Sequence, residues 1–308
     1  MERIALFLAA AAAMAFSAAG GKCPEKVDWR RADDIAPGVK YICVEVDEPR
    51  IMANHLVRVD LRTPGLRVTG TRRPREWGGQ MPDYSAKPLK IDAKRQTTQD
   101  FLEEHRANGT NMVFALNTSA WIPWVRPHNH KYGSFLNFFV SEGEVVSHAT
   151  NRCPMVVVFT NNTAAITSRI ADADVPSVSV AHPSYDTELI MKNGRRVRPP
   201  RKQYTPKVAP RTAMGLSADG RWLYALVVDG RQKGYSEGAS MGDLARMLKA
   251  AGAADAVNMD GGGSATLVFW DGKNSRSSIP NRHNENRTGY RPVAANMGFY
   301  FENVAKSE

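Results

Sequence analysis

The sequence feature that most constrains this chain is the segment A-V-N-M-D-G-G-G-S-A-T-L-V-F-W, from Ala256 to Trp270. Its two ends, Ala256–Met259 and Thr266–Trp270, are rich in β-branched and aromatic residues, which predicts two buried strands. Three consecutive glycines raise the entropy lost on ordering, so a plain turn has no need of them. Glycines also expose backbone N–H groups, and Asp260 stands at the mouth of the loop. We therefore interpret the loop as functional; the alternative is a tight, solvated connection between strands.

Short apolar runs separated by turn residues predict an α+β fold, a single domain with a largely antiparallel or mixed sheet and few helices. Thr212–Leu216 and Trp222–Val228, joined across Asp219-Gly220, are typical of a hairpin. The stretch Ala171–Tyr185 is polar and is expected to be a connection without regular structure. No linker is evident, so one domain is expected.

Two segments carry helix signals. Thr98–Arg106 combines a threonine cap, an early acidic residue and a glycine stop. Met241–Ala251 follows Ser240, has Asp243 at the capping-box position and ends before Gly252. The second helix leads directly into the glycine loop.

The N-terminus predicts export. Arg3 precedes the apolar run Ile4–Phe16, which is too short to span a bilayer, and small residues then favour cleavage after Ala19. Residues 1–19 are therefore expected to be a signal peptide, and residues 20–50 an N-terminal lead with the first strand. Cys23 suggests a lipoprotein anchor, but Gly21-Lys22 fits that motif poorly. We expect a periplasmic or secreted protein with no membrane span.

The net charge of +10, from 41 Lys and Arg against 31 Asp and Glu, favours anionic partners such as phosphate-bearing glycans. Nucleic acid is not expected, because no aromatic-interleaved basic motif or zinc-knuckle spacing is present. In an oxidising compartment, Cys23, Cys43 and Cys153 predict one disulfide and one odd thiol, with the pairing open. The oligomeric state is open as well.

The glycine loop does not match three familiar motifs. A phosphate-binding P-loop opens a helix and carries a Lys-Ser/Thr pair, whereas a strand follows this loop and no lysine lies in it. A serine-hydrolase elbow needs glycine two residues after its serine, and Thr266 stands there instead. A calcium-binding EF-loop needs Asp or Asn at alternate positions, where this loop has glycines.

Arginines mark two nearby strand ends. Arg211 precedes the strand Thr212–Leu216, and Arg231 follows the strand Trp222–Val228. Arginine can clamp an anion bidentately in a way that lysine cannot, so these two are candidates for phosphate binding. The alternative is a pair of surface arginines on hairpin ends.

Three segments between Pro210 and about Phe269 carry a resemblance: P-R-T-A-M-G-L-S-A-D-G-R, V-V-D-G-R-Q-K-G-Y-S-E-G-A-S-M-G-D-L-A and A-V-N-M-D-G-G-G-S-A-T-L. In this order and spacing they resemble the phosphodiester glycosidase family. Weaker similarity extends from about His55 to R-P-V-A-A-N-M at Arg291–Met297. The resemblance implies that residues 51–303 form a phosphodiester glycosidase-like catalytic domain. One departure is clear: N-T-S-A-W at Asn117–Trp121 replaces an N-G-G-F-F-like segment of the family.

The resemblance implies hydrolysis of a glycosyl-1-phosphate diester at the anomeric centre. Ordinary glycosidases use two carboxylates, one of which protonates a poor leaving group. A phosphate monoester leaves far more readily, so one carboxylate near the anomeric carbon and donors for the phosphate are what remain necessary. Asp260 is the candidate carboxylate, as nucleophile, base or oxocarbenium stabiliser. The other candidate site residues are Asn117 and Arg211 (catalytic), and Arg231, Asp229, Gly261, Gly262, Gly263, Ser264, Thr266 and Glu237 (substrate-binding).

Two other functions stay open. A non-catalytic glycan-binding protein that keeps the family fold is favoured by the N-T-S-A-W departure. A phosphodiesterase that breaks the P–O bond would need a metal cluster, and His128 and His130 lie in a polar loop without a spaced carboxylate partner. We therefore expect no metal and no cofactor. The leading hypothesis requires Asn117, Arg211 and Asp260, at the ends of three strands, to converge on one cleft.

Overall fold

The computed structural model describes residues 21–302, except residues 83, 85–86, 124–129, 151–152, 185–188, 198–206 and 284–289. Most of this chain lies in strands, and every strand pair within the described part is antiparallel. The expected predominance of antiparallel sheet over helix is confirmed.

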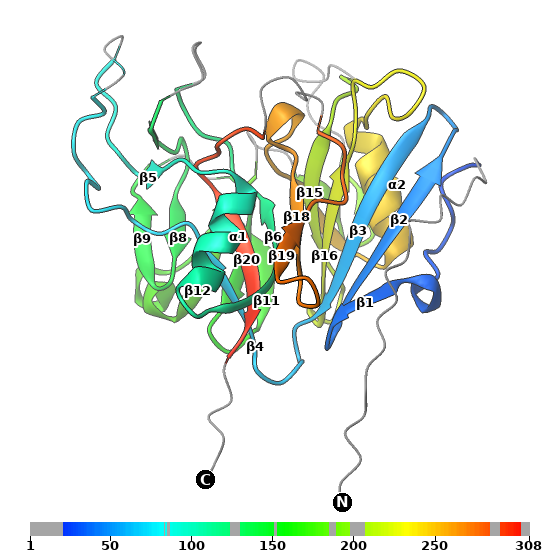
Figure 1. Ribbon diagram of the computed structural model, residues 1–308, viewed down its shortest axis with the longest axis horizontal. Coiled ribbons are helices and arrows are strands. Elements are labelled where there is room, and N and C mark those ends of the chain that lie inside the picture. Colours follow the sequence, from blue (N-terminus) through cyan, green and yellow to red (C-terminus); the bar gives the residue numbers. More distant parts are fainter. Residues whose placement is uncertain are drawn as a thin grey trace, which may run out of the picture.

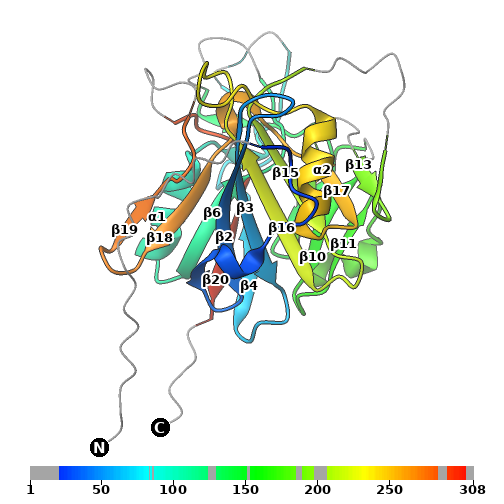
Figure 2. The same ribbon diagram turned by 90° about the vertical axis from the view of Figure 1, so that its right-hand side faces the viewer.

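The strands form three main sheets (Figure 1 and Figure 2). The first has the order β1-β2-β3-β16-β15-β17-β13-β14, with strands at Asp33–Ala36, Val39–Val46, Met52–Asp60, Trp222–Val228, Arg211–Leu216, Asp255–Asn258, Leu189–Lys192 and Arg195–Arg196. The second has the order β19-β18-β6-β20-β4, with strands at Arg276–Ser278, Leu267–Asp271, Asn111–Asn117, Asn296–Phe301 and Leu66–Gly70. The third has the order β11-β10-β12-β8-β9, with strands at Ala164–Thr167, Met155–Phe159, Val178–Pro183, Phe139–Ser141 and Glu144–Ser147. A short pair joins β5 (Ala93–Lys94) to β7 (Tyr132–Gly133).

Two α-helices lie on the outer faces of the sheets. The helix α1 (Thr98–Ala107) begins after Thr97, whose hydroxyl accepts a hydrogen bond from the Asp100 amide, and packs on β6 and β18. The helix α2 (Met241–Ala251) has the predicted bounds and packs on the eight-stranded sheet (Figure 1). Its N-terminus has the expected capping box, and Gly252 ends it at φ 115°. Short 3-10 turns occur at η1 (Trp29–Arg31), η2 (Asp172–Ser177) and η3 (Gly262–Ser264).

The largest apolar core lies between the sheets. It joins Val57 and Met214 of the eight-stranded sheet to Phe114 and Leu267 of the β18–β6 sheet, all of them buried. Val156 of β10 belongs to the same core. The central strands are covered on one face by this core and on the other by a helix. Burial on both faces holds these strands in place, so the residues at their ends have fixed positions.

One segment differs from its prediction. Ala171–Tyr185 was expected to be a polar connection, but it contains η2 and the strand β12, whose six residues are all buried at the centre of the third sheet. The sequence V-S-V-A-H-P lacks a continuous apolar run because Ser179 and His182 interrupt it. The polar atoms of Ser179 and His182 are buried because both faces of this strand are covered. A strand buried on both faces shows no alternation of apolar and polar residues, so the sequence pattern did not predict it.

The expected disulfide is wrong, because Cys23, Cys43 and Cys153 are not joined by a disulfide. They lie in different environments: Cys43 is exposed on β2, Cys153 is buried beside Ser184, and Cys23 packs against the core under α2. The strand β2, in the predicted N-terminal lead, pairs with β3 along its whole length.

The predicted signal peptide, residues 1–19, lies outside the described residues. Within the described part, no helix has the length and apolarity needed to cross a bilayer.

Candidate active site

The glycine loop connects two different sheets. It leaves β17 in the eight-stranded sheet, passes through η3 and enters β18 in the β18–β6 sheet; η3 is the short orange coil at the top of Figure 1. The Asp260 amide donates to the Thr118 carbonyl at 2.6 Å, and the Gly262 amide donates to the Pro210 carbonyl at 2.8 Å. The loop is therefore fastened to the end of β6 on one side and to the start of β15 on the other.

This arrangement brings Asn117, Arg211 and Asp260 to the same end of the sheets, as expected. Asn117 ends β6, and its side-chain amide donates to the Asp260 carbonyl at 2.6 Å. Arg211 begins β15, and its charge acts on the Asp260 carboxyl. A Cβ at Gly261 would lie 3.2 Å from the Arg211 Cα, so the loop and the start of β15 are in direct contact.

Asn117 holds this region together. Its Oδ1 accepts from the Thr212 hydroxyl at 2.8 Å and from the Thr266 amide at 3.0 Å, while its Nδ2 binds the Asp260 carbonyl. The side chain is 1% exposed, so each of these bonds is shielded from water. One amide thus ties β15, the Asp260 backbone and the start of β18 together.

Asp260 is a buried carboxyl with one oxygen that is left without a hydrogen bond by the described residues. It is 3% exposed, and no group in the described part of the chain hydrogen-bonds its Oδ2. Burial raises the pKa of the Asp260 carboxyl to about 7, against the smaller opposing effects of Ser264, Arg291, the Gly261 amide and Arg211. A buried polar atom with no partner costs stability, so such groups are retained mainly at functional sites.

Two separate steric constraints require glycine at positions 261 and 262. A Cβ at Gly261 would lie 2.6 Å from the Pro210 carbonyl oxygen, and Gly262 has φ 64° in the left-handed region. The N–H of Gly262, a candidate substrate-binding residue, is already bonded to the Pro210 carbonyl and cannot donate to a phosphate in this arrangement. The Gly261 amide bonds the Asp260 carboxyl, and the Gly263 carbonyl accepts from His283.

Asp229 has a different environment from Asp260, although both follow a strand and precede a glycine. Its buried carboxylate accepts from Tyr235 at 2.9 Å, from the Arg282 amide at 2.9 Å and from Asn281 at 3.3 Å, and it contacts His55 Nε2 at 3.1 Å. Its oxygens are occupied by these four groups. These bonds favour a structural role for Asp229, and its contact with substrate stays a prediction.

His55 completes this buried network. Although its burial alone would lower the pKa of His55, the hydrogen bond to Asp229 and the neighbouring Cys43 thiol raise it to about 9. Its Nδ1 hydrogen-bonds the Tyr41 hydroxyl at 2.9 Å. The network fixes Asn281, which in turn bonds the Ala265 carbonyl and holds the far side of the glycine loop.

The remaining predicted residues lie around Asp260 at different depths. Ser264 and Thr266 are buried, and the Ser264 hydroxyl lies close enough to the Asp260 carboxyl to lower its pKa. Arg231 is exposed, and a Cβ on Gly262 would lie 3.4 Å from its Nη2, so its guanidinium covers the loop. Glu237 is exposed, and its backbone bonds Ile51 and Arg231.

Sequence reasoning missed Arg291. This arginine is 9% exposed and its positive charge acts on Asp260 more strongly than that of Arg211 does. It begins the segment R-P-V-A-A-N-M, whose similarity to the family was noticed without a role being given to its arginine. Trp121 is 1% exposed and packs against the Arg95 guanidinium, so it belongs to the core.

The departure at N-T-S-A-W has a structural explanation. The Thr118 hydroxyl hydrogen-bonds His182 Nδ1 at 2.8 Å, and the Ser119 hydroxyl donates to the Pro183 carbonyl at 2.8 Å. Both side chains therefore turn toward the end of β12, while the Thr118 carbonyl still receives the Asp260 amide. Complete burial lowers the pKa of His182 to about 3, so this imidazole is neutral.

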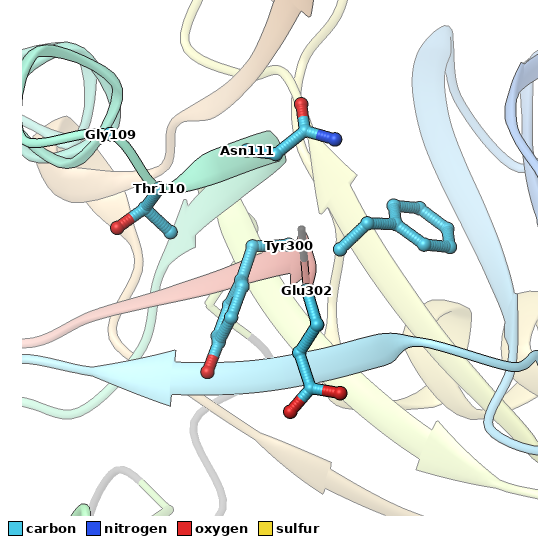
Figure 3. A pocket seen from close by; sticks show the side chains of 6 residues that line it. Gly109, Thr110, Asn111, Tyr300 and Glu302 are labelled. Atoms are coloured by element: carbon cyan, nitrogen blue, oxygen red, sulfur yellow. The ribbon is translucent and has the colours of Figure 1, made fainter. Parts of the chain in front are cut away.

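Two hollows lie away from this site. One, of about 460 Å³, is lined by residues such as Asn111 and Tyr300, at the ends of β6 and β20 that point away from Asp260 (Figure 3). The other, of about 430 Å³, lies between α1 and the end of β4. The described residues contain no group of three or more His, Cys, Asp or Glu side chains placed to hold a metal. His130 is buried, and His128 lies outside the described residues.

Comparison with known proteins agrees with the geometry. Residues 110–300 match the model of the phosphodiester glycosidase family. No curated protein sequence gives a match.

Several solved structures share the fold, including the two that follow. The catalytic domain of zebrafish N-acetylglucosamine-1-phosphodiester α-N-acetylglucosaminidase, in a form auto-inhibited by its pro-peptide, superposes with a TM-score of 0.58 at 16% identity. The alignment covers 87% of this chain and 85% of that one. A hypothetical protein from Synechocystis superposes with a TM-score of 0.55 at 13% identity, over 88% of this chain and 64% of that one.

Proposed function

This chain belongs to the phosphodiester glycosidase family, and from that premise we propose that it hydrolyses a glycosyl-1-phosphate diester at the anomeric C–O bond. The observation that carries the proposal is the desolvated Asp260 carboxyl at the junction of two sheets, with two arginines acting on it. In a site of low dielectric, a carboxylate attracts positive charge at the anomeric carbon far more strongly than it would in water.

Asp260 has the role of the key carboxylate, as nucleophile, base or oxocarbenium stabiliser. As the C1–O bond breaks, its electron pair stays on the phosphate oxygen and the phosphate monoester departs. A water molecule supplies the new hydroxyl on C1, and its second proton is released. The raised pKa of Asp260, about 7, means that the reactive, ionised form is gained as the pH rises toward neutrality.

The departing phosphate requires positive charge rather than a proton donor. Arg291 and Arg211 lie close enough to act on Asp260, and Arg231 covers the glycine loop. Guanidinium groups bind phosphate oxygens bidentately, so these three are the proposed phosphate ligands. With Gly262 already engaged, Gly263 is the remaining glycine whose amide is proposed to contribute a donor.

Hydrolysis in ¹⁸O-labelled water tests the proposal. Incorporation of the label into the sugar hydroxyl is the expected result, since it requires C–O cleavage. Label in the phosphate would mean P–O cleavage and would contradict the proposal. The matched control is Asp260→Asn, which keeps the size of the side chain and removes its charge.

The second candidate is a glycan-binding protein without catalytic activity. The observation that favours it is the replacement of two family glycines by Thr118 and Ser119. Because both hydroxyls bond β12 rather than face Asp260, the replacement does not block the carboxyl. Binding without turnover across a panel of glycosyl phosphodiesters, in a folded protein, would favour this candidate over the hydrolase.

Export is part of the proposed function. Residues 1–19 have the charge, apolar run and small residues of a signal peptide. Intact-mass analysis of the mature protein is expected to show a chain starting at Gly20 without a lipid. A lipid on Cys23 would contradict the proposed soluble form.

A further inference from the structure

We propose that Thr118 and His182 are positioning residues for Asp260, because they hold the backbone to which the proposed catalytic residue is fastened. The inference rests on the proposed function for the reaction, and on buried contacts between the second and third sheets for the positioning. Neither side chain is proposed to touch the substrate. His182 orients Thr118, and Thr118 holds Asp260.

Thr118 follows the last residue of β6 and is held by three hydrogen bonds. Its amide donates to the Ala295 carbonyl at 3.0 Å, and its carbonyl accepts from the Asp260 amide at 2.6 Å. Its hydroxyl hydrogen-bonds His182 Nδ1 at 2.8 Å. The residue is completely buried, so water does not compete for these bonds. A movement of the Thr118 backbone is therefore transmitted directly to Asp260.

The imidazole ring of His182 is fixed by close packing. It stacks on Phe139 with 4.2 Å between the ring centroids, and Phe139 in turn stacks on Phe135 at 4.3 Å. Gly70 of β4 approaches the ring so closely that a Cβ at this position would lie 2.5 Å from Nε2. Because interiors packed this densely leave a side chain little room to move, Nδ1 of His182 has a fixed place beside Thr118.

The imidazole at position 182 costs the fold stability. Its Nε2 is buried, and no described residue hydrogen-bonds this atom. A buried polar atom without a hydrogen bond is unfavourable, whereas a leucine at this position would bury no polar side-chain atom. A histidine retained despite this cost indicates a function, and the hydrogen bond of its other nitrogen to Thr118 shows what that function can be.

A second hydrogen bond fastens the same junction to the third sheet. The Ser119 hydroxyl donates to the Pro183 carbonyl at 2.8 Å, so two consecutive hydroxyls bond two consecutive residues of β12. In the N-G-G-F-F-like segment of the family, glycines stand at both positions, and glycine has no side chain to form such bonds. In this chain β12 thus supports Asp260, although none of its residues lies in the glycine loop.

Two variants of Thr118 separate the hydroxyl from the rest of the side chain. Thr118→Val keeps the shape and removes the bond to His182, so kcat is expected to fall about tenfold or more while KM stays within about threefold of the wild type. Thr118→Ser keeps the hydroxyl and should have a kcat close to that of the wild type. The substrate is the diester that the wild type cleaves fastest in a panel of methyl diesters of sugar 1-phosphates.

The matched control is Thr69→Val. Thr69 of β4 is also buried, and its hydroxyl also joins the second sheet to the third, where it donates to Glu142. Its backbone pairs with Gly298 of β20 and not with the glycine loop. Loss of this hydroxyl should therefore leave kcat unchanged.

A double variant separates position from stability. Thr118→Val alone leaves Nδ1 of His182 buried without its partner, so its melting temperature should fall by about 2–6 °C. Adding His182→Leu removes both polar partners and should recover much of this loss. We expect kcat of the double variant to stay low, because nothing then orients the Thr118 backbone. If kcat recovered together with the melting temperature, the pair would be structural only and the inference would be overturned.

Hydrogen exchange measures the positioning without a substrate. In the full chain, Thr118→Val should raise the exchange rate of peptides covering residues 258–266 about fivefold or more, whereas peptides from α2 should exchange as in the wild type. Unchanged exchange in the glycine loop would overturn the inference, as would a wild-type kcat in Thr118→Val, and both results would leave the proposed function intact. If the wild type cleaves no diester, the proposed function fails, and the exchange rates alone decide whether Thr118 and His182 position Asp260.

Discussion

Replacing Asp260 with asparagine has two consequences of opposite sign. The change removes the carboxylate proposed to act at the anomeric carbon, so activity falls. It also removes a carboxyl that the fold keeps desolvated, with no hydrogen bond to its Oδ2 from the described residues, so the charge-burial penalty disappears. A residue retained for function at the expense of stability should show both effects.

The size of the stability effect follows from the pKa of Asp260. The folded value is about 7, compared with about 3.9 for an unfolded aspartate. Between these two values the folded chain binds the proton more tightly than the unfolded chain, so the free energy of unfolding falls as the pH rises from about 4 to 7. A difference of about three pKa units corresponds to roughly 4 kcal/mol. Above pH 7 the contribution is constant.

The assay compares urea unfolding of the wild type and of Asp260→Asn from pH 4 to pH 8. Because other titrating groups cancel in the difference, the variant should gain up to roughly 4 kcal/mol relative to the wild type across this range. In parallel, kcat/KM should fall on the order of a thousandfold, again about 4 kcal/mol. In the wild type, kcat/KM should rise with pH and level off above about pH 7.

Two results would refute this reasoning. A stability difference that does not change with pH would mean that Asp260 is not desolvated. A folded Asp260→Asn protein with nearly full activity on a cleaved substrate would remove Asp260 from catalysis, whatever its pKa.

Three further predictions concern neighbouring parts of the site. Arg211→Lys keeps the charge but loses the bidentate fork, so activity on phosphodiesters should fall about ten- to a hundredfold, and the loss should shrink for a nitrophenyl glycoside; an equal loss on both substrates would contradict a role at the leaving group. The pKa of His55 is about 9 when folded and about 6.5 when unfolded, so the interactions of its imidazolium with Asp229 and Cys43 together contribute roughly 3 kcal/mol below pH 6.5, which is lost as the pH rises through 9. Urea unfolding from pH 6 to pH 10 should show this decline in the wild type and not in His55→Gln; parallel curves would argue against it. Gly261→Ala places a Cβ 2.6 Å from the Pro210 carbonyl and should cost about 1–3 kcal/mol in thermal melts and at least tenfold in activity, whereas Gly272→Ala, with open space around it, should change neither; similar behaviour of the two variants would show that the loop tolerates the methyl group.

Local signals accounted for much of the fold. The bounds of α2 were predictable because a capping box and a left-handed glycine act within a few residues of each helix end. The strands on either side of the glycine loop were predictable from their apolar runs. In contrast, β12 was missed because its neighbours bury Ser179 and His182, and burial by distant segments leaves no local mark.

Residue types and strand ends predicted the convergence of Asn117, Arg211 and Asp260. The roles within that cluster depended on contacts between segments far apart in the sequence. Asn117 connects two strands because Thr212 and Thr266 both donate hydrogen bonds to its Oδ1. The Gly262 amide cannot donate to a substrate because it already donates to the Pro210 carbonyl. Arg291 enters the site through a segment that has no motif of its own.

Asp229 and Asp260 have similar sequence contexts but different surroundings in the folded protein. Asp229 and Asp260 each follow an apolar strand and precede a glycine, so the sequence determined that two carboxylates would stand at strand ends. Only the tertiary structure gives the two carboxyl groups different environments. Asp229 is surrounded by four hydrogen-bonding groups, among them His55 from another strand, whereas Asp260 is buried with one oxygen that no described residue hydrogen-bonds. The pKa of a carboxyl depends on the partners and the water around it, and both are set by the packing of the sheets.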